Sequence, residues 1–222
     1  MISIFYINIS NFLSDANYEN YLESLPYEMQ FKIRKYKNLK DRKLILFGKL
    51  MLRMLADEFK AQESDFLEEI EYNNYGRPYV ENSNILDFNI SHSGDYVVCA
   101  MSDSSKLGID IEKIDNDIDI SNFKFQMLDE EWDRINISEQ KAKMFYNYWT
   151  EKESVIKAEG TGMQNSLKLF IVKKNTTTLK NKLWYITKIP IDDLYKCNLT
   201  TDQLISYNEI SIKELKMEDF EG

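Results

Sequence analysis

The chain of 222 residues contains one histidine, His92, and two cysteines, Cys99 and Cys197. A single histidine excludes zinc sites that use two or three imidazoles, and a Ser-His-Asp triad could be built only on His92. Two cysteines are too few for a disulfide framework, and their separation fits no metal-binding spacing. The sequence therefore indicates neither a disulfide-stabilised protein nor a histidine-rich zinc enzyme.

The glycine-rich motifs that bind phosphate are also absent. There is no Walker A sequence, no Gly-x-Gly-x-x-Gly and no Gly-x-Ser-x-Gly elbow. Any phosphate group must therefore be bound by Lys and Arg side chains, by His92, or by backbone amides at helix ends and turns.

Long apolar runs are missing as well. No run reaches the ~18 residues expected of a membrane span, and residues 1–10 alternate like a strand and have no basic segment before them, unlike a signal peptide. Seven Gly and three Pro in a chain that is 43% apolar are ordinary for a globular protein of one large or two small domains. We expect a cytoplasmic protein with no membrane partner.

Acidic charge dominates the chain but is unevenly distributed. The net charge is −9, whereas residues 32–53 carry nine basic side chains against one acid, Asp41. That segment is +8, so the remainder is −17. The basic segment predicts an anion site or an acidic partner surface, although single lysines in it could simply solvate a helix face. The acidic remainder argues against nucleic-acid binding.

Hydrophobic periodicity predicts an α+β fold. Helices are expected from Pro26 to about Leu39, then from 44 to 59, 122 to 134 and 139 to 159. Ser138 is the expected N-cap of the last helix, and Gly160 its end. Strands are expected at 2–9, within 70–80, and at 85–91, 95–102, 107–113, 168–173, 183–190 and 194–201, with a short element after Ser206.

Two acidic segments carry the strongest chemical signal. In Leu107-Gly-Ile-Asp110-Ile-Glu112-Lys113 a strand would place both carboxylates on one face and both isoleucines on the other. In Trp149-Thr-Glu-Lys-Glu153-Ser-Val-Ile-Lys157 a helix would stack Trp149, Glu153 and Lys157 along one stripe. Three carboxylates and an ammonium suit a hard cation beside an anionic substrate, since Mg²⁺ binds through carboxylates and substrate phosphates. Taken alone, Asp110 and Glu112 could also be an ordinary exposed strand edge.

These two segments together resemble the paired signature of 4′-phosphopantetheinyl transferases. Asn89-Ile-Ser-His-Ser-Gly94 and Tyr75-Gly-Arg-Pro78 follow the family order, and the resemblance extends to Trp184-Tyr-Ile186 and Tyr195-Lys196. Length and spacing resemble the surfactin-synthetase-type branch. The resemblance implies a monomer of two similar α+β halves related by a pseudo-twofold, residues 1–104 and 105–222, with the active site at their interface.

The same resemblance implies the reaction. Such enzymes transfer the 4′-phosphopantetheine arm of coenzyme A to a serine of an apo peptidyl or acyl carrier protein and release adenosine 3′,5′-bisphosphate. Asp110, Glu112 and Glu153 would ligate Mg²⁺, with Mn²⁺ as the alternative metal, and Lys157 would lie near the pyrophosphate. Two alternatives stay open: a catalytically silent protein that binds coenzyme A or the carrier, and a divalent-metal phosphohydrolase.

Coenzyme A contacts are implied for a group of basic and polar residues. Ser91 and His92 would contact a phosphate group of coenzyme A, and Arg77 would contact its nucleotide. Lys32 and Arg53 of the basic segment would provide further contacts to coenzyme A. In this region the family commonly has an Arg three residues after an Asp. Three residues after Asp41 this chain has Leu44, so we expect Arg42 or Lys43 to make the coenzyme A contact instead.

The base that deprotonates the carrier serine has three candidates. Glu131 fits a family glutamate pattern, although the neighbouring Asp129 and Glu130 leave open which of the three acids corresponds to the family glutamate. Glu153 and a metal-bound water are the others. For carrier docking, the segment holding Phe123, Lys124, Phe125, Met127 and Leu128 is expected to contribute an apolar and basic surface, with a core role for these apolar residues as the alternative.

Overall fold

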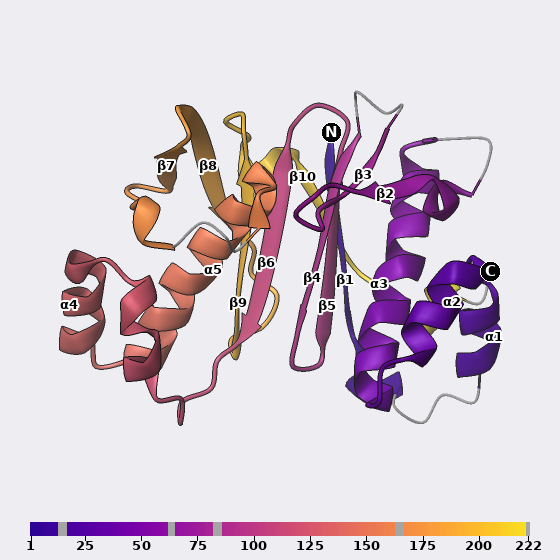
Figure 1. The fold of residues 1–222 in the computed structure, drawn as a ribbon, viewed down its shortest axis with the longest axis horizontal. Coiled ribbons are helices and arrows are strands. Elements are labelled where there is room, and N and C mark those ends of the chain that lie inside the picture. Colours follow the sequence, from indigo (N-terminus) through magenta and orange to yellow (C-terminus); the bar gives the residue numbers. More distant parts are fainter. Residues whose placement is uncertain (13–16, 62–64, 82–85, 163–166, 221–222) are drawn as a thin grey trace.

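The computed structural model describes residues 1–12, 17–61, 65–81, 86–162 and 167–220 (Figure 1). It confirms the α+β class. The helices are α1 (Tyr18–Glu23), α2 (Tyr27–Arg34), α3 (Leu39–Glu58), α4 (Asp129–Ile137) and α5 (Lys141–Glu159). The strands are β1 (Ile2–Asn8), β2 (Ile70–Tyr72), β3 (Pro78–Val80), β4 (Asp87–Ser93), β5 (Tyr96–Ser102), β6 (Leu107–Lys113), β7 (Thr176–Leu179), β8 (Lys182–Lys188), β9 (Tyr195–Thr201) and β10 (Ile210–Glu214).

Two four-stranded sheets form the centre of the described structure. The first has the order β10-β1-β5-β4 and the second β6-β9-β8-β7, while β2 and β3 form a separate hairpin. Helix α3 lies against the first sheet and α5 against the second, so the two long helices flank the paired sheets (Figure 1). Strand β10 returns from the second half of the chain to pair in parallel with β1.

The layered arrangement follows from period-two alternation on buried strands. In β1, Phe5 and Ile7 enter the core under α3, whereas Ile2 and Ile4 enter a second core shared with the other sheet. Ile109 of β6 joins that second core. Because β6 alternates in the same way, its even-numbered side chains face away from this core.

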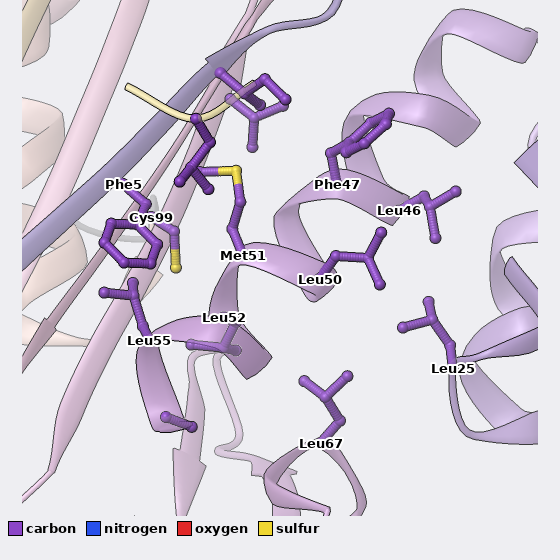
Figure 2. Close-up of a cluster of buried hydrophobic side chains, with 14 of the residues drawn as sticks. Phe5, Leu25, Leu46, Phe47, Leu50, Met51, Leu52, Leu55, Leu67 and Cys99 are labelled. Carbon is purple, nitrogen blue, oxygen red and sulfur yellow. The ribbon is translucent and has the colours of Figure 1, made fainter. Parts of the chain in front are cut away.

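Helix α3 supplies the largest share of the first core (Figure 2). Asn38 caps it, accepting a hydrogen bond from the Lys40 amide at 2.8 Å. Its apolar stripe includes Phe47, Met51 and Leu55, and Met51 and Leu55 face Phe5 of β1 in Figure 2. This packing fixes α3 against the sheet that contains β4 and β5.

Several local expectations are corrected by the structure. The helix after Pro26 stops at Arg34, and α3 already begins at Leu39. Residues 120–126 form a 3-10 helix before α4, so the single helix expected at 122–134 is wrong. Ser138 ends α4, and Gln140 is the N-cap residue of α5. The strand expected at 168–173 is wrong, since 167–169 is a 3-10 turn and the strand β7 starts at 176.

Gly160 ends α5 as expected, with φ at +88°. Both cysteines are buried free thiols. Within the described ranges, no helix is both long enough and apolar enough to span a bilayer.

Candidate functional site

Close packing of α5 on β6 creates the site. A Cβ atom at Gly108 would lie 2.3 Å from both the Ala158 amide nitrogen and the Ser154 carbonyl oxygen. Only glycine therefore allows this approach of helix and strand. The approach brings Glu153 of α5 next to the carboxylates of Asp110 and Glu112 on β6.

These side chains line one small cavity of about 260 Å³. Lys157 donates from Nζ to Asp110 Oδ1 at 2.6 Å and to Ser91 Oγ at 2.9 Å. The structure thus brings together six predicted site residues from three elements. The full lining consists of Ile90, Ser91, His92, Asp110, Glu112, Trp149, Glu153 and Lys157.

Strand β4 forms the other wall of the cavity. It contacts β6 through side-chain hydrogen bonds, and the two strands do not pair backbone to backbone. Each strand is the edge of its own sheet. Polar side chains on alternate residues of β4 accept hydrogen bonds from alternate backbone amides of β6. The bonds run from Leu107 N to Asp87 Oδ2 (2.7 Å), Ile109 N to Asn89 Oδ1 (3.0 Å), Ile111 N to Ser91 Oγ (3.2 Å) and Lys113 N to Ser93 Oγ (3.0 Å).

Sequence reasoning missed the part played by Asp87 and Ser93 in this ladder. The signal was present, because polar residues alternate at 87, 89, 91 and 93 in a strand whose neighbour is buried. Such alternation indicates a polar strand edge, although it does not say which segment the edge contacts.

Ser91 and Ser93 orient the acidic side chains. Ser91 Oγ donates to Asp110 Oδ1 at 3.0 Å and accepts from Ile111 N and Lys157 Nζ, so its one donor and two acceptor positions are used inside the protein. Ser93 Oγ donates to Glu112 Oε2 at 2.6 Å. In this structure Ser91 therefore positions Asp110 and Lys157, rather than offering a free hydroxyl to phosphate.

Burial raises the pKa of all three carboxyl groups, and repulsion from Asp110 adds to this at Glu112 and Glu153. Burial raises the pKa of Asp110, although Lys157 opposes this shift. Burial also raises the pKa of Glu112. Burial and then the nearby Asp110 charge raise the pKa of Glu153 to about 7. Such a cluster would be stabilised by an added positive charge.

The donor set suits a hard cation, although no ready-made metal site is formed. Across the residues that the structure describes, no group of three or more His, Cys, Asp or Glu side chains is arranged to hold a metal ion. Two buried oxygens, Asp110 Oδ2 and Glu153 Oε1, nevertheless lack hydrogen-bond partners there and are free to ligate. The residues present therefore fit Mg²⁺ by their chemistry.

His92 lines the same cavity with an exposed side chain. Partial loss of hydration, and then the Lys157 ammonium, lower the pKa of His92 below its ordinary value. An anion bound between His92 and Lys157 would offset the repulsion from the ammonium and so raise the pKa of His92 again.

The predicted basic residues of 32–53 separate into accessible and occupied groups. Lys32 is exposed, with Nζ 5.8 Å from the centre of the Tyr72 ring, and Arg42 donates to the Tyr36 carbonyl at 2.6 Å. Lys43 is almost fully buried and lies over Tyr18, so its ammonium does not face solvent.

Two predicted arginine contacts are taken up by the protein itself. Arg53 forms an ion pair with Asp65 at 2.8 Å. Arg77 donates to Asp87 Oδ2 at 2.7 Å, to the Leu107 carbonyl at 2.9 Å and to the Lys157 carbonyl at 2.9 Å. Arg77 thus ties β4, β6 and α5 together and is not among the residues that line the cavity.

Glu131 is not brought to the cavity. Its Oε2 accepts from Lys152 Nζ at 2.6 Å and from the Leu128 amide at 2.9 Å, and both charged side chains are buried. These contacts give Glu131 a structural role at the start of α4, where a catalytic base was expected. Of the two glutamates considered as the base, Glu153 lines the cavity and Glu131 does not.

The expected docking segment is divided between core and surface. Met127 is buried, and Phe123 packs edge-on against Trp149 with ring centres 5.5 Å apart. Phe125 is 65% exposed. The core alternative therefore holds for Met127, while Phe125 stays available on the surface.

Comparison with known proteins gives a consistent result. A family model described as 4′-phosphopantetheinyl transferase, N-terminal, matches residues 13–104, and one described as 4′-phosphopantetheinyl transferase superfamily matches residues 106–207. The chain is 32% identical to 4′-phosphopantetheinyl transferase gsp of Aneurinibacillus migulanus, covering 99% of this chain and 93% of the relative. It is 29% identical to 4′-phosphopantetheinyl transferase Sfp of Bacillus subtilis (strain 168), with 78% and 76% coverage. It is 32% identical to 4′-phosphopantetheinyl transferase psf-1 of Bacillus pumilus, with 72% and 70% coverage.

Proposed function

Because the chain belongs to the 4′-phosphopantetheinyl transferase superfamily, we propose that it moves the 4′-phosphopantetheine arm of coenzyme A onto a serine of an apo carrier protein in a Mg²⁺-dependent reaction. The second product is adenosine 3′,5′-bisphosphate. The carrier is a peptidyl or acyl carrier protein that binds transiently to a monomeric enzyme.

The observation that supports this most directly is the composition of one cavity. Asp110, Glu112 and Glu153 line it together with Lys157, although they come from a strand and a separate helix. A lone strand edge would not require Glu153 or Lys157 to face the same space. Carboxylates beside an ammonium are the set that a metal–pyrophosphate substrate needs.

Each residue has a defined task in the proposed reaction. Asp110, Glu112 and Glu153 would hold Mg²⁺, which supplies charge neutralisation at the pyrophosphate. The serine oxygen attacks the phosphorus that carries the pantetheine arm, and the bond from that phosphorus to the bridging oxygen breaks. Lys157 stabilises the negative charge that develops on the departing adenosine 3′,5′-bisphosphate.

We assign the serine proton to Glu153. Glu153 lines the cavity, and a carboxylate has two oxygens, so one can hold the metal while the other accepts the proton. A base must reach the hydroxyl directly or through one water, and a carboxylate inside the cavity meets this condition whereas Glu131 does not. His92, Lys32 and Arg42 are the accessible predicted contacts for the nucleotide end of the coenzyme.

Intact-mass spectrometry of a purified apo carrier domain tests the proposal. With coenzyme A and Mg²⁺ we expect a gain of one phosphopantetheine group, which is lost with EDTA or with Asp110→Asn. A thermal-shift titration with coenzyme A and Mg²⁺ should show stabilisation of the native protein and a weaker effect for Asp110→Asn.

The same experiment separates the alternatives. Stabilisation by coenzyme A without any mass gain on several carrier domains would assign a silent binding protein. Hydrolysis of coenzyme A without carrier modification would assign a phosphohydrolase. Either result would overturn the transferase proposal.

A further inference from the structure

A second hollow region lies beside the N-terminal half of α5. Two adjoining hollows of about 700 and 460 Å³ share Lys143, Asn147, Lys188 and Lys196. We call this region the lysine groove. Its three lysines come from α5, β8 and β9, and Pro190, Ile191 and Tyr207 add apolar surface to the larger hollow.

The three ammonium groups have no close partner. In the described part of the chain, none of them forms an ion pair or a hydrogen bond. The carboxylate of Glu151 interacts electrostatically with Lys188 and that of Asp193 with Lys196. The hollows are also lined by Glu139, Asp192 and Asp193, so the surface carries both signs of charge. Partial desolvation, followed by repulsion from Lys143 and Lys188, lowers the pKa of Lys196. In a chain of net charge −9, three lysines thus lie together with no carboxylate of the described residues at ion-pair distance.

The groove adjoins the catalytic cavity. Lys196 is the register partner of Glu112 across β6 and β9. Lys188 pairs with Asn198, which pairs with Asp110. At about 4.8 Å between neighbouring strands, the Lys196 and Lys188 backbones lie roughly 5 and 10 Å from those of Glu112 and Asp110.

A large acidic partner fits this geometry better than a small anion does. The lysines are spread over three elements along two open hollows, whereas a small anion needs donors that converge on one point. A protein that delivers a serine to the cavity must also cover the surface next to it. Positive charge there attracts an acidic surface and speeds encounter.

We propose that the lysine groove is the docking surface for an acidic face of the carrier protein substrate. This inference rests on the proposed transferase function and specifies where its protein substrate binds. The contact is electrostatic and exposed, so it contributes to encounter and affinity more than to the chemical step.

Binding measured without transfer tests this directly. The probe is a fluorescently labelled carrier domain of net negative charge whose acceptor serine is replaced by alanine, titrated with the full-length protein. We expect the double variant Lys188→Glu/Lys196→Glu to raise the Kd about tenfold or more, and the difference to shrink as salt is raised. With an intact acceptor, KM for the carrier should rise similarly, while KM for coenzyme A and kcat stay within about twofold.

A control variant carries the same change of charge at a different place on the surface. Lys60 and Lys174 are exposed and, in the described part of the chain, form no ion pair or hydrogen bond. The variant Lys60→Glu/Lys174→Glu should change the Kd by less than about twofold if the effect is local.

The outcomes distinguish the two proposals. Unchanged carrier affinity in the groove variant, with transfer intact, overturns the docking surface and leaves the transferase function. Groove-dependent binding without transfer overturns the function and keeps the surface. If titration with inorganic pyrophosphate alone reveals a site that the groove variant removes while carrier affinity is unchanged, the groove is a small-anion site and the docking proposal is wrong.

Discussion

The ammonium nitrogen of Lys157 lies 2.6 Å from Oδ1 of Asp110. This ion pair joins α5 to β6 inside a cavity that holds two further carboxylates. In the protein without a metal, Lys157 supplies the positive charge that the three acids require. A bound metal would need part of the same carboxylate, so the lysine and the metal interact through Asp110.

Replacing Lys157 by methionine should therefore separate two effects. Removal of the competing cation should tighten Mn²⁺ binding in the absence of coenzyme A by about threefold or more. Loss of the ammonium should lower kcat by about 10²–10³-fold, because a charge that stabilises the leaving group is gone. Calorimetric Mn²⁺ titration and carrier-modification kinetics measure the two quantities. Weaker Mn²⁺ binding by the variant would contradict the competition, and Lys180→Met is the control on the same half.

Ser93→Ala should affect the metal requirement more than the maximal rate. The hydroxyl donates to Glu112 Oε2 at 2.6 Å, and its loss frees that carboxylate to turn. We expect the Mg²⁺ concentration for half-maximal activity to rise about tenfold to a hundredfold, equivalent to one lost hydrogen bond to a charged group. Calorimetric Mn²⁺ titration should show the same change.

Ser3→Ala is the matched control, since Ser3 donates to Glu58 at 2.7 Å away from the cavity lining. It should leave the metal dependence unchanged. Equal Mg²⁺ curves for Ser93→Ala and the wild type would show that Glu112 does not depend on Ser93.

Gly108→Ala should destabilise the fold at the site. The new methyl group would overlap backbone atoms of Ser154 and Ala158, which cannot rotate away. We expect the free energy of unfolding to fall by about 3 kcal/mol, measured by urea denaturation. Gly48→Ala meets only side chains, Ile90 at 3.2 Å and Val97 at 3.5 Å, and should change stability by less than about 1 kcal/mol. Similar unfolding curves for the two variants would mean that α5 can move away from β6.

Glu131→Gln tests whether this residue is structural. The amide keeps an acceptor for the Leu128 amide but leaves the buried Lys152 ammonium without its counter-charge. We expect a loss of about 3–5 kcal/mol in the free energy of unfolding and a kcat of the folded protein within about threefold of wild type. Chemical denaturation and kinetics at low temperature measure both. Full stability with a hundredfold lower kcat would instead restore Glu131 as the base.

The parts of the structure that were predictable depend on local patterns. Strand β6 has the predicted bounds 107–113, because its alternation of isoleucine and carboxylate is read within a few residues. The expected strand at 168–173 failed because a short apolar run does not specify its partner, and 167–169 turns instead.

Side-chain roles were harder to predict than side-chain identity. Lys43 and Arg77 are basic residues in the regions expected to meet coenzyme A, yet one is buried over Tyr18 and the other binds Asp87. A long cationic side chain is placed by whichever acceptor the fold brings within reach, and that acceptor can be far away in the sequence. Its sequence position therefore does not distinguish a ligand contact from an internal bond.

Motif order and strand or helix periodicity are local properties, so the family, the α+β class and the members of the acidic cluster could be identified from the amino-acid sequence. How the cluster is assembled depends on tertiary contacts. Gly108 sets the distance between α5 and β6, the hydroxyl of Ser91 holds Asp110 and Lys157, and the side-chain ladder joins two sheet edges. These are contacts between distant segments, and their geometry exists only once both cores have formed.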